Sequence, residues 1–171
     1  VEEAAANQRE KGSVFNHPSG LMPELAEALT DLIEFADWAV FGKNGSDMTT
    51  WAVQVAREFT GRKKILKIQG TYHGVDPWCT PGSGGIIEED VAHVHAFPWN
   101  DLAAFQNLVA RHRGEVAALI ITPFHHPAFG DSEMPAEGFL PKIEKICRKE
   151  EILLVLDDIR AGFRLALGGS H

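Results

Sequence analysis

Four short segments combine residue types that could bind a charged, planar ligand. The first, Gly42-Lys43-Asn44-Gly45-Ser46-Asp47, lies between a strand-like run and a helix-like run. Glycine lets backbone N–H groups converge on an anion, and the N-terminus of the following helix adds about 0.3–1 kcal/mol of favourable dipole interaction. The same residues could instead serve only as a helix cap, with Ser46 or Asp47 accepting from the first amides. No GxxxxGK[ST] pattern occurs, so a nucleotide-type phosphate loop is excluded.

The second segment, Gly70-Thr71-Tyr72-His73-Gly74, follows the strand-like run 65–68. Glycines on both sides allow close backbone approach, so the Tyr72 ring could lie flat against a planar ligand. Offset stacking of this kind adds about 0.5–1.5 kcal/mol beyond the area that is buried. The alternative is a tyrosine that only covers the edge of the core.

The third and fourth segments follow the apolar run ILLVL. Asp157 comes directly after this run, and an unpaired carboxylate at the end of a buried strand is costly. A protonated pyridine nitrogen, Mg²⁺ or an arginine would each be a suitable partner. Asp158 adds the alternative of an acid pair for metal binding or phosphotransfer. Arg164, in Ala161-Gly162-Phe163-Arg164, could supply a cation to the same cleft or remain solvated.

The elements that must position these segments alternate along the chain. Helix-like periodicity covers 23–35, 46–60, 101–111 and 135–149, and strand-like runs cover 38–41, 65–68, 91–95, 116–121 and 152–156. Residues 71–90 are predicted to form a long exposed loop. Because 116–121 and 152–156 are continuously apolar, we expect an α/β domain with a mainly parallel sheet flanked by helices. Ligands of such sheets bind at the carboxyl ends of the strands, where the four segments lie.

Composition excludes several classes of protein. The net charge is -8, and no basic stripe suited to nucleic acid occurs among the 171 residues. No apolar stretch approaches the roughly 18 residues of a membrane-spanning helix. Cys79 and Cys147 lack CxxC spacing and are interpreted as reduced thiols of a cytosolic protein. The histidines, His93, His95 and His125-His126 among them, match no zinc motif, so no metal site is predicted.

Taken in order, the four segments resemble the class III pyridoxal-phosphate aminotransferases, a family that includes glutamate-1-semialdehyde aminomutase. Residues 44–48 resemble the family's Ser-Gly-Thr-Glu-Ala phosphate loop, 71–74 match its Tyr-His-Gly segment, and 157–164 resemble its Asp-Glu-Val-x-Thr-Gly-Phe-Arg signature. The resemblance implies a fold-type-I large domain. We expect an N-terminal helical segment over 1–36 and a cofactor-binding large domain, incomplete at its C-terminus, over 37–171.

The resemblance also implies roles for individual residues. Gly45 and Ser46 would hold the phosphate of pyridoxal 5'-phosphate, Tyr72 would stack on its ring, and His73 would lie beside the ring. Asp157 would pair with the ring nitrogen and keep it protonated. The implied activity is amino-group transfer between an amine or amino acid and a carbonyl acceptor, by a cytoplasmic homodimer.

The sequence departs from the family pattern in two ways. Thr122-Pro123 stands where the family usually has Glu-Pro. The Schiff-base lysine is expected beyond Arg164, and none of the chain's lysines matches its motif, so we expect a piece of a longer enzyme that is inactive alone. An aminomutase or racemase of the same fold, and a non-catalytic cofactor-binding homologue or fragment, remain as alternatives.

Overall fold

A computed structural model describes residues 1–14, 17–82 and 84–170, and the chain divides into two compact units, Val1–Val40 and Phe41–His171. The first unit contains helices α1 (Glu2–Lys11) and α2 (Leu21–Leu32). Helix α2 begins slightly before the predicted helix and ends earlier, because Ile33 already has extended backbone angles. The division of function between 1–36 and 37–171 stays a prediction.

The second unit is built on a four-stranded sheet in which every neighbouring pair is parallel, as predicted. The order is β2-β1-β3-β4. The strands are β1 (Lys64–Ile68), β2 (Val94–Phe97), β3 (Val116–Ile121) and β4 (Leu153–Leu156). Every residue of β3 is buried, as expected for a central strand with helices on both faces.

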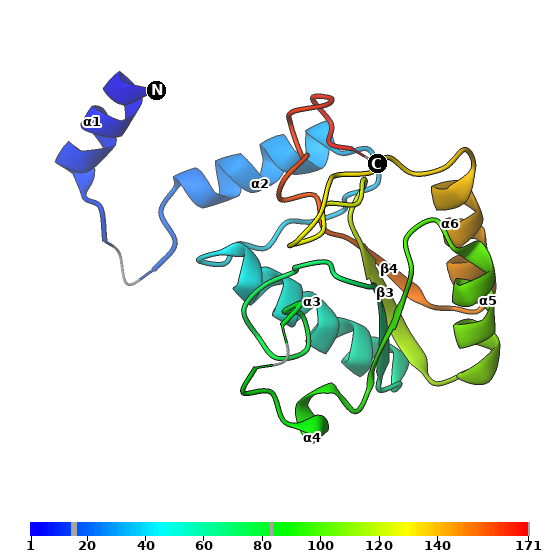
Figure 1. Ribbon diagram of the computed structural model, residues 1–171. Helices are drawn as coiled ribbons and strands as arrows, with labels where there is room; N and C mark the ends of the chain where they lie inside the picture. Colours follow the sequence, from blue (N-terminus) through cyan, green and yellow to red (C-terminus); the bar gives the residue numbers. More distant parts are fainter. Residues whose placement is uncertain (15–16, 83, 171) are drawn as a thin grey trace. The chain divides into compact units, whose positions relative to one another are not determined.

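Helices cover both faces of this sheet (Figure 1). Helix α3 (Gly45–Thr60) lies on one face, and α5 (Leu102–Arg111) and α6 (Phe139–Lys149) lie on the other. Alternate strand residues point to opposite faces, so each face has its own core. Ile65 and Ile120 pack with Val53 on the α3 face, whereas Leu66 and Leu119 pack with the two other helices.

Three predicted strands differ in the structure. The prediction for Trp38–Phe41 was wrong: these residues form no strand, and the Trp38 side chain is 64% exposed. Strand β2 begins at Val94 because the short helix α4 (Glu88–Val91) occupies the start of the predicted run. Strand β4 was expected to be buried on both faces, but it forms an edge of the described sheet and Leu154 is 40% exposed.

The strand order places a crevice at the carboxyl edge of the sheet. After β1 the chain passes to β2 on one side, and after β3 it passes to β4 on the other. Segments that leave two adjacent strands in opposite directions open a space between them, which is where ligands of such sheets bind. The segments that follow β1, β3 and β4 therefore meet at this edge.

Candidate functional site

The N-terminus of α3 forms one wall of the site. Asn44 is the N-cap: its side-chain oxygen accepts from the Asp47 amide at 3.0 Å, and its side-chain nitrogen donates to the Asp47 carboxylate at 3.0 Å. The alternative that Ser46 or Asp47 is the N-cap is therefore ruled out, since both residues lie inside the helix. The amides of Gly45 and Ser46, in the first turn, have no acceptor within the helix and are available to an anion.

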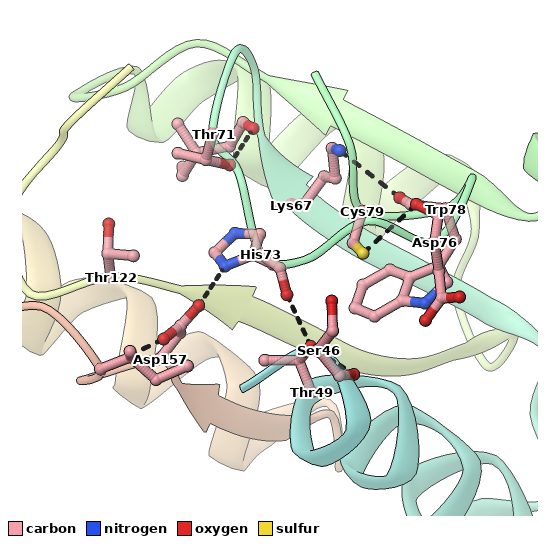
Figure 2. Close-up of polar contacts among 12 residues, drawn as sticks. Ser46, Thr49, Lys67, Thr71, His73, Asp76, Trp78, Cys79, Thr122 and Asp157 are labelled. Atoms are coloured by element: carbon pink, nitrogen blue, oxygen red, sulfur yellow. Dashed lines mark hydrogen bonds and ion pairs between the residues drawn. The ribbon is translucent and has the colours of Figure 1, made fainter. Parts of the chain in front are cut away.

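The loop after β1 is fastened to this first turn (Figure 2). Thr49 donates its hydroxyl proton to the His73 carbonyl at 2.6 Å, and the Val75 amide donates to Oγ of Ser46 at 2.8 Å. Gly74, at φ 145°, permits the close approach, because a Cβ there would clash with Ser46 and lie 3.1 Å from Sγ of Cys79. The loop and the helix therefore form one continuous surface.

A buried lysine supports the same loop from beneath. Nζ of Lys67, on β1, donates to the carbonyls of Trp78 and Thr80, each at 3.4 Å. Burial lowers the pKa of Lys67, and burial raises the pKa of the neighbouring Cys79 thiol to about 11. The Lys67 amine thus anchors the loop by binding two of the loop's backbone carbonyls, and Lys67 is not among the residues that line the cavity.

A buried histidine–aspartate pair crosses the floor of the site. Asp157 follows β4, and its amide donates to the Ile121 carbonyl at 2.8 Å, which continues the sheet by one residue. Its Oδ2 accepts from Nδ1 of His73 at 2.8 Å, and its Oδ1 accepts from the Ile159 amide at 3.3 Å. Both side chains are almost completely buried, so the pair fixes the orientation of the carboxylate (Figure 2).

These elements enclose a cavity of about 510 Å³, and all five residues predicted to bind a cofactor line it. They are Gly45, Ser46, Tyr72, His73 and Asp157. The Tyr72 side chain is 41% exposed, so its ring is accessible to a ligand. The cavity therefore combines a helix N-terminus, an accessible aromatic ring and an oriented carboxylate.

Sequence reasoning missed several other lining residues, among them three with ionisable side chains: Asp76 in the loop after β1, His126 on the segment after β3, and Arg160 close to Asp157. The pair His125-His126 was interpreted as ordinary loop histidines, although its place after a buried strand was a signal that could have singled it out. Arg164 was suggested as the cation of the cleft, but it is exposed, contacts the Gly162 carbonyl at 3.3 Å and does not line the cavity.

The acid pair suggested for metal binding does not share one site. Asp157 lines the cavity, whereas the Asp158 carboxylate accepts from the Ser170 amide at 2.9 Å and is not among the lining residues. Within residues 1–14, 17–82 and 84–170, no group of three or more His, Cys, Asp or Glu side chains is arranged to hold a metal ion. The helices in these ranges are also too short or too polar to cross a membrane.

Comparison with known proteins gives one consistent family. The family model described as "Aminotransferase class-III" matches residues 1–169. Aminopentol aminotransferase of Sphingopyxis macrogoltabida is 43% identical over 166 residues, which cover 97% of this chain and 39% of that protein. Glutamate-1-semialdehyde 2,1-aminomutase of Hyperthermus butylicus is 33% identical and is covered over 42% of its length.

A solved structure confirms the predicted fold class. The PLP internal aldimine form of the FumI protein of Sphingopyxis sp. MTA144 matches with a TM-score of 0.92 and 44% identity, over 96% of this chain and 40% of that one. The chain thus spans about two-fifths of the length of the relatives it matches.

Proposed function

The chain belongs to the class III aminotransferases, as the sequence resemblance predicted, and on this premise we propose that the protein is a pyridoxal-phosphate-dependent aminotransferase. It would transfer an amino group between an amine or amino acid and a carbonyl acceptor. The observation that carries this proposal is the cavity in which the α3 N-terminus, Tyr72 and Asp157 meet. Each of them complements a different part of one small, planar, phosphorylated ligand.

The anionic end of the cofactor fits the first turn of α3. The amides of Gly45 and Ser46 would hold the phosphate, helped by the positive end of the helix. Because Oγ of Ser46 already accepts from the Val75 amide, its own proton is free to be donated to the phosphate. Gly45 has no side chain between the phosphate and the backbone.

The ring of the cofactor fits between Tyr72 and the buried carboxylate. Tyr72 would stack on the ring, and Asp157 would hold a proton on the ring nitrogen. His73 orients Asp157 from behind. When it is bound, the cofactor withdraws electrons from the substrate carbon into its protonated ring, which is the chemistry that this family of cofactors supplies. Asp157 is thus the residue of this chain that acts on the reactivity of the cofactor.

The residue that attaches the cofactor is not among the residues that line the cavity in our proposal. No lysine lines the cavity among the residues that the structure describes, so we place the lysine that attaches the cofactor outside residues 1–171.

We further propose a cytoplasmic homodimer. The large apolar side chains that the second unit exposes, such as Val75, Phe129 and Leu165, are suited to burial against a partner subunit.

Aminomutase activity is the second candidate, because the 33% identical relative from Hyperthermus butylicus has that activity in its name. The test is to load the full-length protein with pyridoxal phosphate, add single amines or amino acids without an acceptor, and follow the cofactor absorbance. An aminotransferase converts the cofactor stoichiometrically and releases a free carbonyl product. An aminomutase isomerises its substrate without net release, and a non-catalytic homologue binds the cofactor without converting it.

A further inference from the structure

We propose that His126 binds the oxygen on carbon 3 of the cofactor ring, and this inference rests on the proposed function. Two lining histidines have a buried ring nitrogen without a hydrogen-bond partner in the described part of the chain, Nε2 of His73 and Nδ1 of His126, and His73 is already bonded to Asp157 through its other nitrogen.

His126 is held in a defined position. It lies on the segment that follows β3, at the carboxyl edge of the sheet, and it is only 8% exposed. Its ring packs edge-on against Phe124, with 5.3 Å between the ring centroids. Its Nδ1 is buried and makes no hydrogen bond to any residue that the structure describes. Because a buried polar nitrogen without a partner costs about 1–3 kcal/mol, a hydrogen bond gained from a ligand in the cavity would stabilise this ring.

The partner can be identified from the polar groups of the cofactor. Its phosphate is assigned to Gly45 and Ser46, its ring nitrogen to Asp157, and its aldehyde to a lysine. The oxygen on carbon 3 remains. That oxygen is separated from the ring nitrogen by two ring carbons, so its partner must lie near Asp157. His126 meets this requirement, because it lines the same cavity as Asp157.

The surroundings of His126 also favour a neutral ring. Burial lowers the pKa of His126, and the nearby Arg160 guanidinium lowers it further. A neutral imidazole has one N–H donor and one acceptor nitrogen, so it can donate to the oxygen without placing a second full positive charge beside Arg160. The contact is therefore a neutral hydrogen bond that orients the ring.

The test uses two probes that lack an aldehyde, so that their binding does not depend on the attaching lysine. They are 4'-deoxypyridoxine 5'-phosphate, which retains the oxygen on carbon 3, and its 3-deoxy analogue. Dissociation constants are measured by fluorescence titration of the full-length apoprotein and of His126→Phe, with His126→Gln as the conservative variant. His125→Gln is the matched control, because His125 stacks on Trp99 and does not line the cavity.

We expect the wild-type protein to bind the 3-oxygen probe about tenfold more tightly than the 3-deoxy probe, as the loss of one buried hydrogen bond implies. His126→Phe should lose this preference, His126→Gln should keep part of it, and His125→Gln should keep all of it. Equal preference in the wild-type protein and in His126→Phe overturns the inference, and so does no preference in the wild-type protein. If neither probe binds to the wild-type protein, the proposed function itself fails, which is a different outcome.

Discussion

At the scale of single residues, the site depends on how Asp157 is held. One oxygen of its carboxylate accepts from His73 at 2.8 Å and the other accepts from the Ile159 amide at 3.3 Å. A carboxylate that is buried and fixed in this way loses little conformational entropy when a cationic ring nitrogen approaches it. It also interacts more strongly with that charge than an exposed carboxylate would.

Asp157→Asn should therefore impair cofactor binding and reactivity more than it impairs folding. We expect the dissociation constant of pyridoxal phosphate to rise at least about tenfold, because a charge-assisted hydrogen bond is worth about 1.5–3 kcal/mol. The rate of amino-group transfer should fall further, since an amide does not keep the ring nitrogen protonated. Absorbance titration and single-turnover kinetics measure the two effects.

The neighbouring residue provides the control for this prediction. Asp158→Asn changes the same functional group one position along the chain, but its carboxylate bonds to the Ser170 amide outside the cavity. It should leave cofactor affinity and turnover close to wild type. Equal loss in both variants would assign the effect to the fold of this segment rather than to the ring nitrogen.

The sequence allowed the five cofactor-binding candidates to be predicted, because each lies in a motif whose order along the chain is informative. His126 could not be predicted in the same way. Its neighbour His125 has the same side chain, and only the packing of the folded chain separates them: His125 stacks on Trp99, and His126 faces the cavity. Arg160 and Arg164 differ for the same reason, since the turn after Asp157 decides which one lines the cavity.

At the scale of elements, helix α3 both supports the core and presents the proposed anion site. Its inner face is buried through Thr49, Val53 and Ala56, whereas its first turn forms a wall of the cavity. The prediction of this helix succeeded because its apolar residues recur at helical spacing. The prediction of a strand at Trp38–Phe41 failed because a short apolar run has no distinctive period and a strand also needs a neighbour to pair with.

The cap of α3 should affect stability and binding together. Asn44→Ala removes the acceptor of the Asp47 amide and should lower the free energy of unfolding by about 1 kcal/mol. It should also weaken pyridoxal phosphate binding by at least about threefold, because the first turn that orients the Gly45 and Ser46 amides frays. Denaturant unfolding and absorbance titration measure the two changes.

Helix α5 offers a matched comparison for that variant. Asp101 is its N-cap and accepts from the Ala104 amide at 2.8 Å, outside the cavity. Asp101→Ala should cost a similar free energy of unfolding and leave cofactor affinity unchanged. If Asn44→Ala and Asp101→Ala weaken binding equally, the α3 terminus has no specific part in holding the phosphate.

Helix α6 carries a thiol whose burial should appear in the pH dependence of stability. Burial raises the pKa of Cys147 from 9.0 to about 12. Above pH 9 the unfolded chain releases this proton while the folded protein keeps it, so the thiol's contribution to stability is complete below pH 9 and decreases as the pH rises toward the folded value. The unfolding free energy of the wild-type protein should fall, relative to that of Cys147→Ala, by about 1.4 kcal/mol between about pH 8 and 10.

Denaturant titrations of both proteins at the two pH values test this prediction. The cavity left by Cys147→Ala lowers stability at both pH values alike, so it cancels in the comparison. A difference between the two proteins that does not change with pH would mean that the thiol is accessible to solvent in the folded state.

At the scale of the whole molecule, the proposed cofactor site brings together segments that follow three strands, but it includes no lysine among the residues that the structure describes. It spans about two-fifths of the length of its relatives, and no lysine in the described ranges lines the cavity. Lys67 is the lysine whose pKa is lowered by burial, which favours the neutral amine that a nucleophile needs. Its amine, however, is engaged with the Trp78 and Thr80 carbonyls beneath the loop.

Reduction of the full-length, cofactor-loaded protein with borohydride should therefore attach one cofactor at a lysine outside residues 1–171, as located by peptide mass spectrometry. Lys67→Arg should leave this adduct in place, because the guanidinium keeps the loop anchored and Lys67 takes no part in attachment. An adduct on Lys67 would contradict this assignment and would require the loop over Trp78 and Thr80 to open for the cofactor. Absence of any adduct in a protein that still binds the two aldehyde-free probes would instead favour the non-catalytic homologue, in which the site holds its ligand without the covalent step.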